Sequence, residues 1–215
     1  MTTAERSTEG ARPGRARLPR SARRAQLLGA AQEVFVAQGY HAAAMDDIAE
    51  RAGVSKPVLY QHFPGKLDLY LALLDRHAAD LVVKIRRALD STTDNRQRVA
   101  GAVEAYFNFV GGEGEAFRLL FESDLRNEPV VRERVERNLQ ECVEAIAETI
   151  AKDTGFDVAE AELLSVGLAG LAEVSARWWL GSGNPPKVSK ERAVELIVTL
   201  AWRGISGSPR RPATS

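Results

Sequence analysis

The helical spacing of apolar residues restricts the fold of this chain more than any other feature. Apolar residues recur every three or four positions along most of the sequence, and no segment alternates with the two-residue period of a β-strand. Residues 67–89 carry one apolar stripe that outlasts a usual helix. Further stripes and short helical segments are expected at residues 27–35, 46–52, 56–62, 99–110, 131–150 and 194–201. We therefore predict an all-α protein.

Size and composition exclude several classes of protein. A chain of 215 residues can bury a core without disulfide bonds, and its one cysteine, Cys142, excludes an intramolecular disulfide. No uncharged run approaches the roughly 18 apolar residues of a membrane span, and the first 25 residues lack the apolar stretch of a secretory signal. We expect a cytoplasmic protein without a membrane partner. His41, His62 and His77 lack metal-ligand spacing with one another and with Cys142, so neither a metal nor another cofactor is expected.

Charge is distributed unevenly along the chain, although the formal net charge is zero. Residues 1–25 contain seven arginines and two glutamates, a net charge of +5, so the remainder carries −5. A basic arm on an acidic body favours a polyanionic partner at one end, with a solvated, disordered terminus as the simpler alternative. We expect residues 1–21 to form a disordered basic arm and residues 206–215 a disordered tail rich in Ser, Pro and Arg.

Residues 45–66, MDDIAERAGVSKPVLYQHFPGK, have the pattern of two short helices that cross closely. In the first half Ile48 faces inward, and the small Ala49 allows a second helix to approach. Gly53 follows where the chain must turn sharply. This arrangement is typical of a helix-turn-helix.

The second half of this segment has the features of a recognition helix. Ser55 suits the N-cap, and Pro57 lies in the first turn, where a missing N–H costs nothing. Leu59 and Phe63 face inward at i,i+4 spacing. Donor and aromatic groups remain outside, where they can enter a major groove of DNA. These outward positions are Lys56, Val58, Tyr60, Gln61 and His62.

Residues 22–78 resemble the DNA-binding domain of the TetR family of transcriptional regulators. The family pattern includes Ile-Ala, Ala-Gly-Val-Ser and Leu-Tyr-x-His-Phe-x-x-Lys. This chain has all three in register as Ile48-Ala49, Ala52-Gly53-Val54-Ser55 and Leu59-Tyr60-Gln61-His62-Phe63 followed by Lys66. The resemblance implies a helix-turn-helix DNA-binding domain of three helices over residues 22–66 and a helical effector-binding and dimerisation domain over residues 67–205. Ala43 and Ala44 depart from the family, which often has Thr or Ser there, so we expect a less well capped first motif helix.

The resemblance also implies which side chains contact DNA. Side-chain chemistry agrees, since lysine donates to guanine acceptors, glutamine pairs with adenine and valine suits a thymine methyl group. The residues that would face the bases are Lys56, Pro57, Val58 and Gln61. Those that would meet phosphates are Tyr60, His62 and Lys66. The remaining predicted contacts are Ser55, Arg20 and Arg23.

Aromatic and apolar residues cluster around a glycine break that follows residue 110. A small-molecule cavity could open between helices there, and ordinary core packing is the alternative for each residue. The expected ligand is a small apolar or amphipathic effector. The candidate pocket residues are Tyr106, Phe107, Phe109, Phe117, Phe121 and Leu125.

Residues 163–180 are apolar on nearly every side, with Glu173 and Arg177 as their only charged residues. A small monomer cannot cover such a helix, so we expect it to pair with the last helix and with a second copy of both, as a four-helix bundle. The expected dimer contacts are Leu164, Leu168, Leu171, Trp178, Trp179, Val194, Ile197 and Leu200.

These features predict a homodimeric transcriptional regulator that binds a palindromic double-stranded DNA operator and responds to a small effector. Repression by occlusion of a promoter is what the resemblance implies. An α-helical interaction or scaffold protein is the alternative, which the basic arm and the exposed donors disfavour. An enzyme is disfavoured because the sequence contains no nucleophile–base or metal constellation, and no catalytic residue is expected.

Overall fold

The computed structural model describes residues 18–112, 124–183 and 185–204. Within these ranges the regular structure is helical, without a strand, which confirms the predicted all-α class. None of these helices is both long and apolar enough to cross a bilayer. The helices are α1 (Arg20–Gln38), α2 (Met45–Arg51), α3 (Lys56–His62), α4 (Lys66–Asp90), α5 (Asn95–Gly112), the 3-10 turn η1 (Asp124–Asn127), α7 (Pro129–Thr154), α8 (Val158–Gly181) and α9 (Lys190–Arg203).

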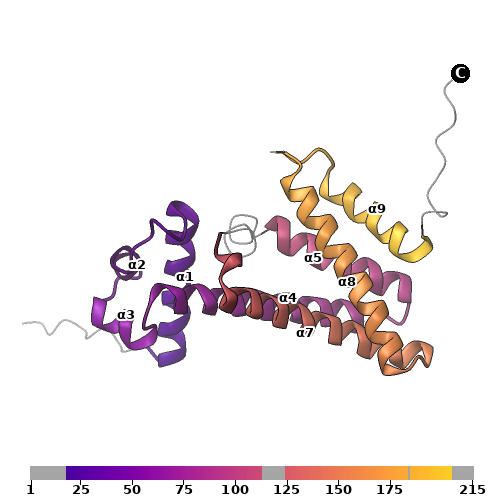
Figure 1. Ribbon diagram of the computed structural model, residues 1–215, viewed down its shortest axis with the longest axis horizontal. Helices are drawn as coiled ribbons and strands as arrows, with labels where there is room; N and C mark the ends of the chain where they lie inside the picture. The colour runs from indigo at the N-terminus through magenta and orange to yellow at the C-terminus, as the bar shows by residue number, and fades with distance from the viewer. Residues whose placement is uncertain (1–17, 113–123, 184, 205–215) are drawn as a thin grey trace, which may run out of the picture.

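Two groups of helices lie at opposite ends of the long helix α4 (Figure 1). Helices α1, α2 and α3 pack around its first half. Helix α5 packs against its second half, and α7 runs beside α4 along its length. Helix α8 packs against α5 and α7, and α9 packs against α5 and α8. The arrangement places a small N-terminal domain at one end of the molecule and a larger helical domain at the other.

The N-terminal core extends further along the chain than the sequence predicts. Fully buried Leu27, Ile48 and Leu59 meet Leu69 and Leu74 of α4 in this core. The first half of α4 therefore belongs to the N-terminal domain, and the boundary expected at residues 66 and 67 is placed too early. A helix boundary is visible in the sequence, whereas a domain boundary inside one continuous helix has no local signal.

Two residues far along the chain also join the N-terminal core. Leu125 of η1 and Val131 in the first turn of α7 are buried in the same cluster as α1 to α4. In Figure 1, η1 and the start of α7 lie next to the N-terminal helices. The beginning of α7 therefore connects the larger domain to the small one.

The helix ends follow the local sequence closely. Gly39 after α1 has φ +78°, as expected for a glycine at that position, and Pro129 begins α7. Asp157 caps α8 by accepting a hydrogen bond from the Glu160 N–H at 2.9 Å.

The N-terminal boundary differs from the expected one. Arg20 is the first residue of α1 rather than part of an arm, so the expected boundary at residue 21 is corrected. Residues 1–17 and 205–215 lie outside the described ranges, with most of the expected arm and tail.

Candidate functional site

Helices α2 and α3 form the expected helix-turn-helix. Ile48 and Ala49 of α2 and Leu59 of α3 are almost completely buried, and Phe63 closes the same core just after α3. Gly53 in the intervening turn has φ +63°, a backbone conformation that a side chain disfavours. The inward side of α3 is thereby held rigidly, which fixes the direction of its outward side.

Helix α1 supports this pair through side chains that sequence reasoning missed. Gln26 Nε2 donates to the Ala52 carbonyl at 2.8 Å and so satisfies the C-terminal end of α2. Arg24 Nη1 donates to the His62 carbonyl at 3.3 Å, and its guanidinium lies 4.2 Å from the centre of the Phe63 ring. Both contacts position the helix-turn-helix against α1. Their sequence separations of 26 and 38 residues leave no local pattern that could have revealed them.

The outward side of α3 carries most of the predicted DNA contacts. Ser55, Lys56, Pro57 and Gln61 are exposed, and Tyr60 keeps 48% of its accessible surface. Val58 and His62 are half-buried at the sides of the helix. Ser55 occupies the expected N-cap position, although its side chain makes no capping hydrogen bond. One short helix thus presents a lysine, a glutamine and a tyrosine on a common surface.

Lys56 is engaged in an ion pair within the isolated chain. Its Nζ lies 2.5 Å from Asp46 Oδ2 in the first turn of α2. The hydrogen bond to Asp46, and then the charge of Asp46, raise the pKa of Lys56 above its ordinary value. Because both side chains are largely exposed, such a pair contributes little to stability. Little free energy is therefore needed to separate Lys56 from Asp46.

Lys66 has a structural role that the sequence did not indicate. Its Nζ donates to the backbone carbonyls of His41 at 3.1 Å and Ala43 at 2.8 Å. The same ammonium lies 4.6 Å from the centre of the Tyr40 ring. Lys66 therefore fastens the α1–α2 connection to the start of α4, and its predicted contact with phosphate would be additional to this role.

The start of α2 has no side-chain cap from its N-cap residue, as the sequence predicts. Ala44 stands at the N-cap, and its N–H donates to Asp47 Oδ2 at a long 3.4 Å. Asp46 and Asp47 place negative charge in the first turn, where it interacts favourably with the helix dipole.

The two arginines predicted to contact DNA, Arg20 and Arg23, lie in the first turn of α1. Arg23 Nη1 donates to Gln26 Oε1 at 2.7 Å.

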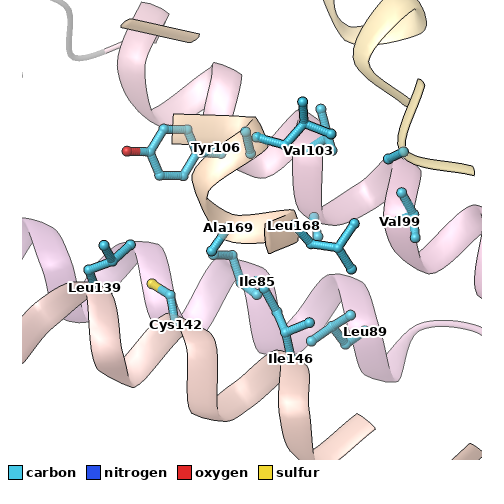
Figure 2. A pocket seen from close by; sticks show the side chains of 14 residues that line it. Ile85, Leu89, Val99, Val103, Tyr106, Leu139, Cys142, Ile146, Leu168 and Ala169 are labelled. Carbon is cyan, nitrogen blue, oxygen red and sulfur yellow. The ribbon is translucent and has the colours of Figure 1, made fainter. Parts of the chain in front are cut away.

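An apolar cavity lies inside the larger domain, between α4, α5, α7 and α8 (Figure 2). Its cavity volume is about 60 Å³, and it rises to about 600 Å³ only when the adjoining open solvent is included. Of its lining side chains, only those of Tyr106 and Cys142 carry a heteroatom. The lining consists of Ile85, Leu89, Val99, Ala102, Val103, Tyr106, Leu139, Cys142, Ile146, Leu168, Ala169, Leu171, Ala172 and Ala201. We refer to this space as the effector cavity.

The effector cavity differs in composition from the predicted pocket. Tyr106 lines it as expected, and Phe109 lines a smaller adjoining cavity. Phe107 instead packs against Trp179, with ring centres 5.6 Å apart, and lines a separate opening beside Val174 and Trp178 of α8. Leu125 packs into the N-terminal core. Neither residue lines the effector cavity, and the assignment of Leu125 to a pocket is corrected, because η1 packs against the N-terminal helices. Two further candidates, Phe117 and Phe121, lie outside the described residues.

The outer face of α8 and α9 is apolar and exposed. Trp178 keeps 63% of its surface, Leu164 45% and Leu200 37%, whereas Val194 and Ile197 are half-buried. Further exposed apolar residues on these helices are Leu163, Val166, Val174, Leu196 and Trp202. We call this set the α8–α9 face.

Three predicted dimer contacts of α8 have other neighbours within the chain. Trp179 is only 7% exposed and donates its indole N–H to the Val188 carbonyl at 2.7 Å. Leu168 and Leu171 line the effector cavity. The assignment of Trp179 is corrected, because a helix that is apolar on every side gives no local indication of which side faces its own domain. The dimer contacts of Leu168 and Leu171, which are half-buried, stay predictions.

The cysteine of the larger domain, Cys142, is buried. Burial raises the pKa of the Cys142 thiol to about 12, so the thiol stays protonated and is a poor nucleophile at neutral pH. Within the described parts of the chain, no group of His, Cys, Asp or Glu side chains has the geometry to hold a metal ion.

Comparison with known proteins agrees with this geometry. Residues 27–73 match the model of bacterial regulatory proteins of the tetR family, a span that ends inside the N-terminal half of α4. The HTH-type transcriptional activator FasR of Mycolicibacterium smegmatis is 50% identical over 212 residues, covering 96% of this chain and 95% of that protein. The chain belongs to the TetR family.

Solved TetR-like structures share the same architecture. A TetR-like transcriptional regulator from Rhodococcus sp. RHA1 is 29% identical, with a TM-score of 0.66, over 89% of this chain and 100% of that one. The transcriptional regulator FadR from Bacillus subtilis, in complex with stearoyl-CoA, is 19% identical with a TM-score of 0.69, over 84% and 98% of the two chains. As a TetR-family member the protein is a DNA-binding transcriptional regulator and not an enzyme.

Proposed function

We propose that this TetR-family protein binds a palindromic operator as a homodimer, with α3 of each subunit in the major groove. The observation that carries the proposal is the contrast between the two sides of α3. Leu59 is locked in the core, while Lys56, Tyr60 and Gln61 are exposed together. A helix whose inward side is fixed in the core and whose exposed side carries hydrogen-bond donors is suited to contacting base edges directly.

The proposed dimer forms through the α8–α9 face. A soluble monomer rarely exposes a continuous apolar surface of this kind, and Trp178 and Trp202 are residues typical of an interface centre. Two-fold pairing of α8 and α9 gives a four-helix bundle and sets the two α3 helices at a fixed separation. One turn of DNA requires about 34 to 36 Å between them.

We propose a long-chain acyl thioester as the effector. The effector cavity is lined almost wholly by apolar side chains, which suits an alkyl chain. A structure of the same fold contains stearoyl-CoA, which supports the chemical class by analogy. Ligand binding would change operator affinity by favouring one relative position of the two α3 helices.

We propose activation rather than repression as the output. The relative that is half identical over nearly the whole length of both proteins is named an activator. Repression, the outcome expected from the general resemblance, differs only in where the operator lies relative to the promoter. Transcription of the neighbouring operon in a deletion strain separates the two: its loss supports activation, and its increase supports repression.

The DNA-binding part is tested with Gln61→Ala. We expect this variant to lose about 1 to 3 kcal/mol of affinity for the operator and almost none for random duplex DNA, because one base contact is removed. Gel-shift titrations of both duplexes at one salt concentration measure the difference.

Gln140→Ala provides the matched control, since Gln140 is an exposed glutamine on α7, far along the chain from α3. It should bind both duplexes like the wild type. Equal losses on operator and random DNA for Gln61→Ala would contradict the base contact. Absence of any salt-dependent duplex binding by the wild type would favour the interaction-protein alternative.

A further inference from the structure

A second, smaller cavity adjoins the effector cavity. Its cavity volume is about 40 Å³, or about 430 Å³ with the adjoining open solvent, and it shares Tyr106, Leu139 and Cys142 with the effector cavity. Figure 2 shows these three residues at one end of the effector cavity, with Val99 and Leu89 toward the other end. The second cavity is therefore an extension beyond one end of an elongated space.

The extension differs from the effector cavity in its polarity. Asn138 of α7 and Glu173 of α8 line it, whereas the effector cavity has neither an amide nor a charged side chain in its lining. An elongated cavity that is apolar along one part and polar at one end matches an amphipathic ligand with its chain in the first part and its polar group in the second.

Asn138 has an unused hydrogen-bond donor at this place. Its Nδ2 is buried and makes no hydrogen bond in the described part of the chain. A buried donor without a partner is rare in folded proteins, because it loses its hydrogen bonds to water without replacement. A ligand atom that accepts a hydrogen bond would supply the missing partner.

The charges around Asn138 favour an uncharged acceptor. Glu173 is largely buried and forms an ion pair with Arg177 one turn along α8. The pair is neutral as a whole, so it offers no excess positive charge to a carboxylate, while the Glu173 oxygens repel one. A thioester carbonyl accepts a hydrogen bond and carries no charge.

We propose that Asn138 Nδ2 donates a hydrogen bond to the acyl carbonyl of the effector and makes the protein selective for acyl thioesters. This inference rests on the acyl effector of the proposed function and adds the residue that recognises its head. Because Asn138 as a whole is only half-buried, the remainder of the thioester can leave the extension toward solvent.

The test compares two ligands that differ only at the carbonyl. Palmitoyl-CoA has the acceptor, and S-hexadecyl-CoA, its thioether analogue, does not. We expect the full-length wild type to bind palmitoyl-CoA about tenfold more tightly in isothermal titration, because the thioether leaves the Asn138 donor unpaired. In Asn138→Leu the two ligands should bind with equal affinity.

Gln140→Leu is the matched control, since it makes the same replacement two residues away on the exposed side of α7. It should keep the tenfold preference. Asn138→Ala gives the same readout should the leucine variant fail to fold. A preference retained in the Asn138 variants, or absent from the wild type, overturns the role of Asn138 while leaving an acyl effector in place. Failure of the wild type to bind either ligand overturns the acyl effector itself.

Discussion

Lys66 links the segment between α1 and α2 to the start of α4. Its position in the Leu-Tyr-x-His-Phe-x-x-Lys pattern is correct, but its ammonium is directed to the carbonyls of His41 and Ala43. The tertiary structure brings residues 23 and 25 positions apart into contact. A lysine that holds a loop in place affects DNA binding through the shape of the domain as well as through its charge.

Replacement of this lysine should therefore lower stability. We expect Lys66→Met to reduce the free energy of unfolding by about 1 to 3 kcal/mol, because two carbonyls lose a charged donor. Urea denaturation followed by circular dichroism measures this, with Lys187→Met, an exposed lysine before α9, as the control. A stability equal to the wild type, together with a salt slope of DNA binding reduced by about 1, would instead assign Lys66 to phosphate contact alone.

At the scale of elements, α7 belongs to both domains. Its first turn and the preceding η1 bury Val131 and Leu125 in the N-terminal core. Farther along, Leu139, Cys142 and Ile146 line the effector cavity. A ligand that displaces α7 must therefore also move residues packed against the helix-turn-helix domain, since close-packed interiors transmit such shifts.

Truncation of Leu125 tests this connection. We expect Leu125→Ala to destabilise the protein by about 2 to 3 kcal/mol through the cavity it leaves, and to weaken the effect of palmitoyl-CoA on operator affinity. The measurements are thermal unfolding and gel shifts with and without ligand. Asn127→Ala, at an exposed position of the same turn, should behave like the wild type. Unchanged ligand response in a destabilised Leu125→Ala would show that η1 plays no part in the coupling.

The N-terminal segment that precedes α1 carries a separate prediction. Deletion of residues 1–17 removes four arginines and two glutamates. Because arginines release counterions when they contact phosphate, we expect the deletion to weaken operator binding and to flatten its salt dependence, without a change in folding stability. Titration across salt concentrations measures the slope. An affinity equal to that of the full chain at every salt concentration would mean that the segment does not contact DNA.

For the whole molecule, the decisive surface is the α8–α9 face. It lies in the larger domain, away from the helix-turn-helix (Figure 1). In a two-fold dimer the separation of the two α3 helices depends on the rigid path from this face through α4 and α7. In the proposed dimer, operator affinity would therefore depend on a surface that lies away from the proposed DNA contacts.

Charge placed in this face should separate the subunits. We expect Trp178→Arg to raise the dimer dissociation constant at least about a hundredfold, because an unpaired charge would be buried at the interface, and to weaken operator binding in parallel. Analytical ultracentrifugation and gel shifts measure the two effects. Val83→Arg, at an exposed apolar position of α4, serves as the control. A wild type that sediments as a monomer at micromolar concentration, or a folded Trp178→Arg that still dimerises, would contradict the proposed dimer.

Local patterns in the sequence were sufficient for the helical class, for most helix ends and for the helix-turn-helix. The apolar period specifies helices, Gly39 and Pro129 mark ends, and the spacing of Ile48, Leu59 and Phe63 places the inward sides of α2 and α3. Each of these depends on residues within a few positions of one another, which is why the sequence reveals them.

Only the tertiary structure decided which apolar residues line a cavity, which pack in a core and which remain exposed. Leu171, Phe107 and Trp178 all lie in apolar helical stripes, yet the first lines the effector cavity, the second is buried and the third is exposed. The unpaired amide nitrogen of Asn138 has no sequence signal either. The spacing of apolar residues shows that a helix has an apolar side. Which segment packs against that side is determined by contacts between distant parts of the chain, and these depend on how all the helices pack together.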